Sequence, residues 1–208
     1  MIADLQMAPV SILFFLGTCM AVVAGFAVLT HAALSGKRRR ARRTAWALGG
    51  GLAFYAALLL GASLFSQERV LGRGVEKYYC EVDCHLAYSV QAVRENGGML
   101  TVELRTRFDE TTTSLRRPKD ATLTPNARRV YLVDGDGNHY QPSAGMTPGS
   151  MSLDHPLLPG ESYQTVFIFP MPRARTGAKL MVENAEWPNR LLIGHENSPL
   201  HGKSYFAL

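Results

Sequence analysis

The first 66 residues of the chain carry two long apolar stretches, and the rest of the chain carries none. Residues 10–34 and residues 45–65 contain no Asp, Glu, Lys or Arg. A helix rises about 1.5 Å per residue, so about 20 residues cross the hydrocarbon core of a membrane, which is about 30 Å thick. A buried helix of a soluble protein is the alternative for each stretch, but two adjacent stretches of this length are hard to bury. The pattern therefore predicts a hairpin of two transmembrane helices within residues 1–66.

Basic residues between the two stretches indicate how the hairpin crosses the membrane. The loop SGKRRRARR, residues 35–43, has six cations and no acidic residue, whereas the residues before the first stretch carry only Asp4. Cytoplasmic loops beside membrane spans are enriched in Lys and Arg. A cleaved signal peptide would need cations before the first apolar stretch. We therefore expect a cytoplasmic loop that contacts anionic lipid, with the N-terminus and everything after residue 66 outside. The six cations are Lys37, Arg38, Arg39, Arg40, Arg42 and Arg43.

Small residues recur at every fourth position in both predicted helices. Such a stripe lets the backbone of another helix approach closely, and the short loop favours an antiparallel pair that packs along the two stripes. Gly and Ala are also common in membrane helices generally, so the pattern leaves the packing role open. The residues are Gly17, Ala21 and Gly25 in the first helix, and Gly49, Ala53, Ala57 and Gly61 in the second.

Residues after 66 form short alternating or β-branched runs separated by turn sequences. The polar stretch 67–77 contains two glycines and is expected to be a linker. DGDGN, residues 134–138, is typical of a hairpin turn. Seven or eight antiparallel strands without a helical period predict an all-β sandwich of the immunoglobulin kind over residues 78–208. The expected strands cover residues 78–93, 99–108, 129–133, 138–141, 162–169, 178–183, 190–194 and 203–207.

Three segments of this region, VYLVDGDGNHYQPS, LLPGESYQTVFIFPMP and AKLMVE, support the same fold by resemblance. Together they resemble the telokin-like, immunoglobulin-type domains of unknown function that are common on bacterial surfaces. The resemblance covers residues 120–183 and consists mainly of turn residues. It implies a non-catalytic module attached to a membrane or secreted protein, here the periplasmic part of a protein of the bacterial inner membrane.

The chain's net charge of +5 comes from the loop rather than from the β domain. From residue 67 onward, 16 Lys and Arg balance 16 Asp and Glu. A nucleic-acid-binding domain would need a basic surface of its own. The composition therefore argues against nucleic acid as a partner.

Two of the three cysteines lie in CEVDCH, residues 80–85, at the start of the predicted domain. In an oxidising compartment a disulfide between Cys80 and Cys84 is the default expectation. A straight strand would place their Cα atoms about 13 Å apart, whereas a disulfide needs about 4.4–6.8 Å. Alternation from Tyr78 to Val90 favours a strand, so the disulfide that we expect requires a local turn.

Copper binding by Cys80, Cys84 and His85 is the main alternative. Their spacing is similar to the dinuclear copper site of cytochrome oxidase subunit II, which also lies outside a two-helix hairpin. This chain departs from the oxidase pattern at two positions. It has Tyr88 and Gln91 where the oxidase site has a histidine and a methionine. Copper favours soft thiolate ligands. A thiol-redox role would instead need a helix N-terminus that lowers the thiol pKa, and no such helix is predicted here.

The remaining motifs favour structural interpretations. The 134–138 turn begins with calcium-loop spacing, but His139 and Gly145 stand where such a loop needs glycine and glutamate. The sequence has no G-x-S-x-G nucleophile motif. The histidines and glutamate of residues 195–201 are expected in a polar loop. These patterns predict no catalytic residue, resident metal or other cofactor.

The sequence therefore predicts a non-catalytic accessory subunit of a larger membrane complex. Two spans would hold the β domain at a fixed height, and the small-residue stripes would pack against other integral membrane subunits. A photosynthetic reaction centre or a respiratory complex would suit this anatomy by analogy. We expect lipid and other membrane subunits as partners, and no free small-molecule substrate.

Overall fold

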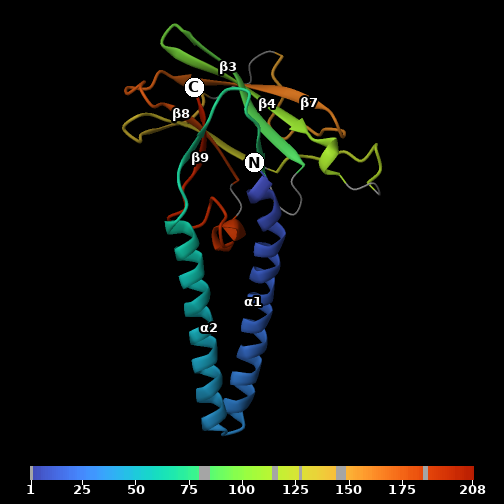
Figure 1. Ribbon diagram of the computed structural model, residues 1–208, viewed down its shortest axis with the longest axis vertical. Coiled ribbons are helices and arrows are strands. Elements are labelled where there is room, and N and C mark those ends of the chain that lie inside the picture. Colours follow the sequence, from blue (N-terminus) through green and yellow to red (C-terminus); the bar gives the residue numbers. More distant parts are fainter. Residues whose placement is uncertain (1, 80–84, 114–116, 127, 144–148, 185–186) are drawn as a thin grey trace. The chain divides into compact units, whose positions relative to one another are not determined.

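The computed structural model describes residues 2–79, 85–113, 117–126, 128–143, 149–184 and 187–208 (Figure 1). They form two compact units. The first consists of Met1–Gln67 and Glu186–Gly202, and the second consists of Glu68–Ala185 and Lys203–Leu208. The chain therefore returns to its helical unit after building most of the β unit.

Two long helices form the first unit, as the apolar stretches predict. Helix α1 spans Ile2–Leu34 and helix α2 spans Arg38–Leu64. Both are long and apolar enough to cross a membrane. Gly36, with φ of 70°, ends α1 in the left-handed conformation that glycine adopts without steric cost. The amide of Lys37 then donates to the carbonyl oxygen of Ala32 and closes the turn.

The two helices meet near the loop and diverge toward their other ends (Figure 1). Near the loop, a Cβ on Gly25 would lie 2.4 Å from Cδ2 of Leu48, so the absence of a side chain allows this close contact. Farther along, the rings of Phe14 and Tyr55 stack with centroids 5.7 Å apart. Most other side chains of both helices are exposed, including Met20 at 75%.

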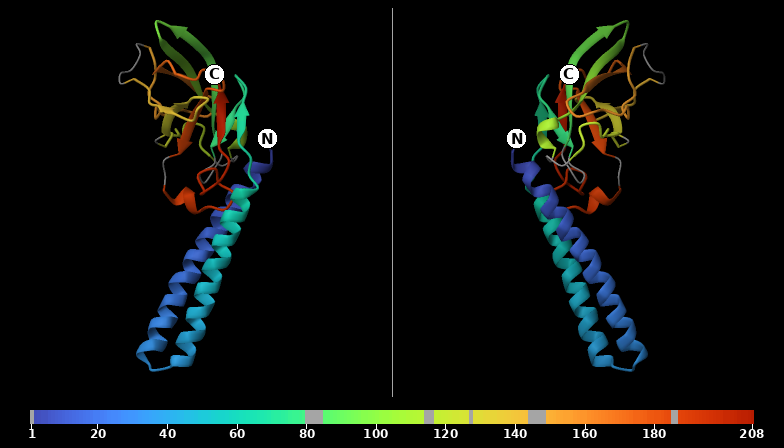
Figure 2. Two further views of the ribbon diagram at one scale, coloured as in Figure 1. Left: turned by 90° about the vertical axis from the view of Figure 1, so that its left-hand side faces the viewer. Right: turned by 90° about the vertical axis from the view of Figure 1, so that its right-hand side faces the viewer.

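Residues 187–202 complete the helical unit. A strand predicted over residues 190–194 is wrong, because Trp187–Leu191 form the 3-10 helix η2 and a series of turns follows. The segment contacts both long helices: Ser11 Oγ donates to the carbonyl oxygen of Ile193 at 2.9 Å, and Tyr55 OH donates to that of Leu191 at 2.6 Å. In Figure 1 it lies between α1 and α2, and Figure 2 shows η2 on one side of the hairpin.

The second unit contains two β-sheets and no closed barrel. One sheet has the order β1-β9-β8-β5-β6 and the other has the order β2-β3-β4-β7. All pairs are antiparallel except β1 with β9, which run parallel. The strands are β1 Arg69–Leu71, β2 Lys77–Tyr79, β3 Leu86–Asn96, β4 Met99–Phe108, β5 Arg128–Val133, β6 His139–Tyr140, β7 Ser162–Pro170, β8 Lys179–Asn184 and β9 Ser204–Ala207.

One hydrophobic core joins the two sheets. Strand β4 alternates strictly between buried and half-buried positions, as a period of two requires for a strand with one face on a core. Its inward side chains meet those of the other sheet in a single cluster. The largest fully buried members of that cluster include Tyr88, Leu104, Phe108 and Phe169 from one sheet and Leu132, Leu180 and Phe206 from the other.

The start of the β unit differs from the sequence prediction. A continuous strand over residues 78–93 is wrong: β2 and β3 are separate antiparallel strands, and Tyr79 is the register partner of Leu86. The predicted linker of residues 67–77 includes β1, which pairs with β9 at the other end of the unit. A three-residue strand is too short to show a period of two in the sequence. Its pairing with a segment at the other end of the unit leaves no local signal either.

Candidate functional site

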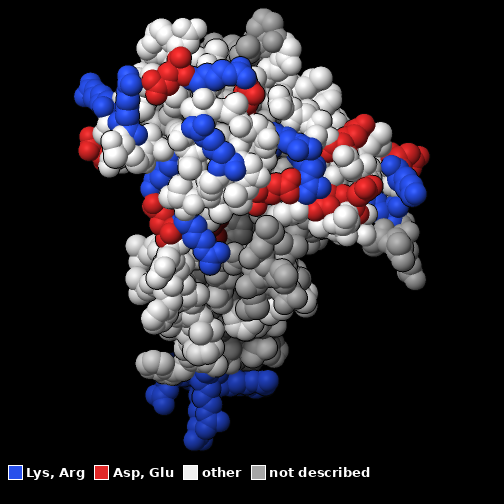
Figure 3. Space-filling model, turned by 45° about the horizontal axis from the view of Figure 1, so that its top comes forward, with Lys and Arg blue, Asp and Glu red and all other residues white. Residues whose placement is uncertain are grey.

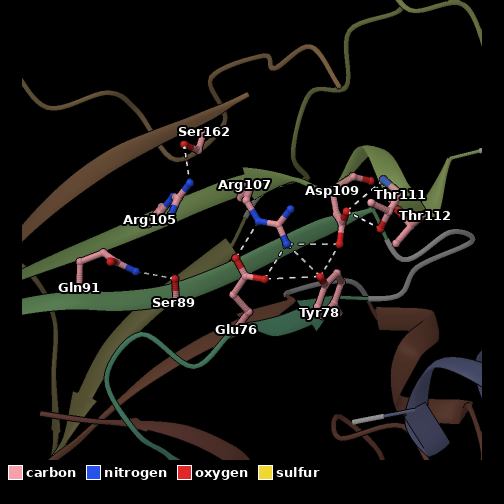
Figure 4. A network of polar contacts seen from close by, with 10 residues as sticks. All are labelled: Glu76, Tyr78, Ser89, Gln91, Arg105, Arg107, Asp109, Thr111, Thr112 and Ser162. Atoms are coloured by element: carbon pink, nitrogen blue, oxygen red, sulfur yellow. Dashed lines mark hydrogen bonds and ion pairs between the residues drawn. The ribbon is translucent and has the colours of Figure 1, made fainter. Parts of the chain in front are cut away.

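Polar side chains gather on the outward face of the β2-β3-β4-β7 sheet. Tyr78 on β2, Ala87 on β3 and Arg107 on β4 form one row of register partners, so their side chains share a face. Ala87 is small and lies in the middle of the row. Tyr78 and Arg107 therefore meet above it, with 3.0 Å between the guanidinium and the phenol oxygen (Figure 4).

Arg107 is held by two carboxylates. Its Nε and one terminal nitrogen donate to the two carboxylate oxygens of Glu76 at 2.7 and 2.6 Å, which is the bidentate geometry that gives strong arginine pairs. The same terminal nitrogen lies 3.2 Å from Oδ2 of Asp109. We call Glu76, Tyr78, Arg107 and Asp109 the polar cluster.

Asp109 connects the cluster to the 3-10 helix η1, Glu110–Thr112. Its Oδ1 accepts from the amide and hydroxyl of Thr111 at 3.0 and 2.7 Å, which caps η1. Its Oδ2 accepts a short hydrogen bond from Tyr78 OH. The side chain is 8% exposed, so these bonds satisfy a nearly buried charge.

The pKa values of the cluster lie far from neutrality. Hydrogen bonding to Arg107 lowers the pKa of Glu76. Burial opposes ionisation of Asp109, but hydrogen bonds from Tyr78, Thr111 and Arg107 outweigh it and hold its pKa well below the usual range. Burial, together with the bond to Asp109, raises the pKa of Tyr78 to about 12. At neutral pH Glu76, Asp109 and Arg107 are therefore ionised and Tyr78 is protonated, so the polar cluster is a fixed electrostatic clamp.

His85 directly follows the predicted cysteine pair in the sequence and is linked to the polar cluster through Thr112. Its side chain is buried, and Nδ1 lies 2.7 Å from the hydroxyl of Thr112, which in turn donates to the backbone oxygen of Asp109. The imidazole ring stacks on Phe108 with centroids 5.7 Å apart. Any ligand bond from His85 would therefore use Nε2, because Nδ1 is engaged by Thr112.

A cavity of about 50 Å³ opens beside His85. Arg128 lies over the rings of Tyr79 and Tyr88, 5.0 and 5.9 Å from their centroids, and the two rings meet edge to face. The cavity is lined by Tyr79, His85, Leu86, Leu123, Thr124, Asn126 and Arg128.

Cys80 and Cys84 lie outside the described residues, so their predicted disulfide and the alternative metal site are not seen. Cys19 in α1 is a free and exposed cysteine. Within the described parts of the chain, no three His, Cys, Asp or Glu side chains are grouped as metal ligands. The histidines near the C-terminus are used locally: Nδ1 of His195 accepts from the amide of Asn197, and Nδ1 of His201 lies 2.7 Å from the carbonyl oxygen of Gly202.

Asp134, which has calcium-loop spacing in the sequence, organises the turn between β5 and β6. Its Oδ1 accepts from the amides of Asp136 and Asn138, and its Oδ2 accepts from Tyr140 OH at 2.9 Å. Burial opposes ionisation, but the bonds from Asn138 and Tyr140 bring the pKa of Asp134 down to about 2. The carboxylate therefore serves the hairpin turn.

The small-residue stripes are mostly uncovered within this chain. Gly25 faces Leu48, whereas a Cβ on Gly17, Gly49 or Gly61 would have nothing within 4 Å. The remaining stripe residues, Ala21, Ala53 and Ala57, are exposed.

The loop cations from Lys37 to Arg43 are solvent-accessible and lie at the start of α2. Figure 3 shows Lys and Arg gathered at one end of the helices and no charge along the helix surface in view. On the β unit in the same view, positive and negative side chains are mixed.

Sequence reasoning missed the polar cluster because its members come from separate segments. The local signal is limited to two pairs of polar residues at a spacing of two, Glu76 with Tyr78 and Arg107 with Asp109. No protein-family model, curated protein or solved structure matches this chain. Its function is therefore argued from the features of the chain itself.

Proposed function

We propose that this chain is a two-pass protein of the bacterial inner membrane and a non-catalytic accessory subunit of a larger membrane complex. The observation that carries the proposal is the exposure of the helices. Large apolar side chains such as Met20, Val23 and Phe54 are 62–75% exposed, and the rest of the chain does not cover them. Water would strongly disfavour such a surface, whereas lipid and other helices provide apolar surroundings.

The charge distribution supports one orientation. The six loop cations lie at the end of the helices where α1 joins α2, and cytoplasmic loops are enriched in such residues. Both ends of the hairpin then face the periplasm. The β unit is an immunoglobulin-like sandwich on that side, an assignment supported by two mainly antiparallel sheets with a shared core.

The accessory role rests on surfaces suited to other subunits. In the helices, Gly17, Gly49 and Gly61 have open space where a Cβ would lie, so a neighbouring helix can approach closely. In the β unit, β2 pairs with β3 only from Leu86 to Tyr88. Just beyond this pairing, the amide of Gly74 donates to the carbonyl oxygen of Val90. Farther along β3, no described strand pairs on that side, which leaves an edge where a partner strand can add.

Isolation of the native complex tests this role, with two adjacent glycines as matched variants. Gly49 belongs to the stripe and Gly50 lies about 100° around the helix, and both have open space within this chain. The tagged chain should be extracted in mild detergent and sized by native electrophoresis, with its partners identified by cross-linking.

The wild type should run with other membrane subunits at fixed stoichiometry. Gly49→Leu should weaken that association about tenfold, equivalent to ~1.4 kcal/mol, and Gly50→Leu should leave it unchanged. A wild-type chain that runs alone would contradict the accessory role. Equal losses in both variants would contradict the assignment of the stripe as the contact surface.

The pairing of β2 with β3 supports a structural disulfide between Cys80 and Cys84, and a copper site is the second candidate. Tyr79 and Leu86 are antiparallel register partners, so their Cα atoms lie about 4.5–5.5 Å apart and bring the two ends of residues 80–85 together, as a Cys80–Cys84 bond requires. The copper candidate is supported by the contact of His85 Nδ1 with Thr112, because ligating histidines are usually oriented through their second nitrogen.

A count of thiols and bound copper separates these two candidates. The chain has three cysteines. After denaturation without reductant, a disulfide leaves one reactive thiol per chain, that of Cys19, and no stoichiometric copper. Three thiols would contradict the disulfide. Stoichiometric copper that is lost in Cys84→Ser would establish the second candidate in its place.

A further inference from the structure

The segment that follows η2 meets the two helices at different depths. Tyr55, which bonds to the carbonyl of Leu191, lies 12 residues beyond Arg43, the last cation of the loop. Those residues rise ~18 Å, so Tyr55 lies in the outer half of a hydrocarbon layer about 30 Å thick that begins near Arg43. Ser11, which bonds to Ile193, lies at the outer end of the apolar run 10–34.

These two contacts place residues 191–193 within the outer leaflet, provided that the helices cross the membrane as proposed above. The residues there are Leu191, Leu192 and Ile193. Irregular backbone is tolerated at such depth only where its polar groups are satisfied within the protein.

Consecutive turns satisfy part of the backbone of this segment. The amides of His195, Ser198 and His201 donate to the carbonyl oxygens of Leu192, His195 and Ser198 at 2.8–3.2 Å. Arg190 is exposed, and its long side chain can extend its charge to the headgroup layer while its stem stays in apolar surroundings.

Large apolar side chains are exposed at the same end of the unit. Trp187 on η2 is 65% exposed, and Leu200 is 71% exposed. Leu200 also has φ of 64°, a left-handed conformation that is unfavourable for leucine. Two residues on, the amide of Gly202 donates to Ser66 Oγ at 2.6 Å, which ties this turn to the end of α2 beside the exposed Phe65.

Water is a poor environment for these side chains, and lipid explains their exposure. Trp favours the membrane–water interface, where its ring is apolar and its N–H reaches polar groups. Leu64 at the end of α2 and Phe65 directly after it are exposed as well. We propose that residues 187–202 form an embedded cap on the hairpin, with Trp187 and Leu200 inserted into the lipid of the outer leaflet.

Trp fluorescence tests this cap directly, because the chain has only two tryptophans, Trp46 and Trp187. Trp46 lies three residues beyond Arg43 and is exposed on α2, so it reports whether the span itself is in lipid. Trp46→Phe and Trp187→Phe each leave one emitter. Each full-length variant should be reconstituted into vesicles of brominated phosphatidylcholine. One lipid carries bromine on the acyl chain near the headgroup, and the other carries it near the end of the acyl chain.

In the Trp46→Phe chain, Trp187 should lose as large a fraction of its fluorescence as Trp46 loses in the Trp187→Phe chain. The bromine nearer the headgroup should quench Trp187 more strongly. Quenching of Trp46 without quenching of Trp187 would overturn the cap while leaving the membrane spans intact. Absence of quenching at both positions would overturn the spans and the cap together.

Leu200 provides a second measurement in the Trp46→Phe background. Asn adopts the left-handed conformation more readily than Leu, so Leu200→Asn relieves the backbone and removes only the apolar contact. If lipid covers this position, Leu200→Asn reduces the bromine quenching of Trp187, whereas Leu200→Phe retains it. Equal quenching in both variants would overturn the role of Leu200 in the cap.

Discussion

At the scale of single residues, the feature with the most hydrogen bonds is the polar cluster around Arg107, which acts as an electrostatic clamp. Glu76 precedes β2 in the sequence and binds Arg107, and Asp109 follows β4. Tyr78 donates to Asp109 and lies across the small side chain of Ala87 from Arg107. Because Arg107 and Asp109 are 24% and 8% exposed, their bonds are shielded from water more than those of a surface pair. The clamp therefore fixes the end of β4, η1 and, through Thr112, the buried His85.

Asp109→Asn should destabilise the β unit by about 1–3 kcal/mol, because it removes charge-assisted bonds from a nearly buried group. The folded state lowers the pKa of Asp109. Its contribution is therefore present above the unfolded pKa of about 3.9 and is lost as the pH falls through the folded value. Urea unfolding of the full chain in detergent, followed by near-ultraviolet circular dichroism, measures this at pH 7 and pH 3.

The difference in stability between wild type and Asp109→Asn should be large at pH 7 and smaller at pH 3. Asp120→Asn removes an exposed carboxylate and is the matched control, with little expected effect. A pH-independent difference would show that Asp109 acts through its shape and not through its charge.

At the scale of elements, the two helices contact each other at Gly25 and Leu48 and, farther from the loop, through the stacked rings of Phe14 and Tyr55. Gly25 is the stripe glycine that meets the facing helix at van der Waals distance, while residues 187–202 bridge the helices farther out. The other stripe residues are left to face lipid or a partner.

Gly25→Leu should disturb the hairpin, whereas Gly17→Leu on the same helix should not. A Cβ at residue 25 would already lie within 3 Å of two atoms of Leu48, and nothing lies within 4 Å at residue 17. Overpacking of this kind costs about 1–3 kcal/mol. Thermal unfolding in detergent, followed by helical circular dichroism, should show a lower midpoint for Gly25→Leu alone. Equal shifts for both variants would mean that helix propensity, and not the contact with Leu48, governs the result.

At the scale of the whole molecule, the chain passes from the helical unit to the β unit twice along neighbouring paths. In the helical unit, Ser66 accepts from the amide of Gly202. In the β unit, the amide of Arg69 donates to the carbonyl oxygen of Lys203, and β1 then runs parallel to β9. The first and last strands are thus paired next to these two connections, and a third covalent connection, between residues 185 and 186, runs back from the β unit to the helical unit.

Trypsin should reveal the proposed orientation of the molecule. Added outside sealed right-side-out vesicles, it should cut at the exposed Arg73 and leave the hairpin whole, because the loop cations face the interior. Added to inside-out vesicles, it should cut between Lys37 and Arg43 and leave the β unit attached to α2. The reverse pattern of fragments would contradict the predicted topology.

The sequence by itself predicted the two apolar helices, the β4 strand and the turn at 134–138. Each depends on local patterns: an uncharged run of helical length, a period of two, and turn residues at fixed positions. For the same reason it misread residues 190–194, where RLLIG has the composition of a strand but forms the end of η2 and a turn. Local composition cannot distinguish these outcomes, because they differ in which distant segment the residues contact.

The tertiary structure decided which segments meet. It joined β1 to β9, split the first predicted strand at Tyr79, and assembled the polar cluster from two pairs of residues that lie 29 to 33 positions apart in the sequence. It also returned residues 187–202 to the helices through the bonds of Ser11 and Tyr55. Contacts across such separations are selected by burial and hydrogen bonding in the folded state, and a one-dimensional pattern carries no record of them.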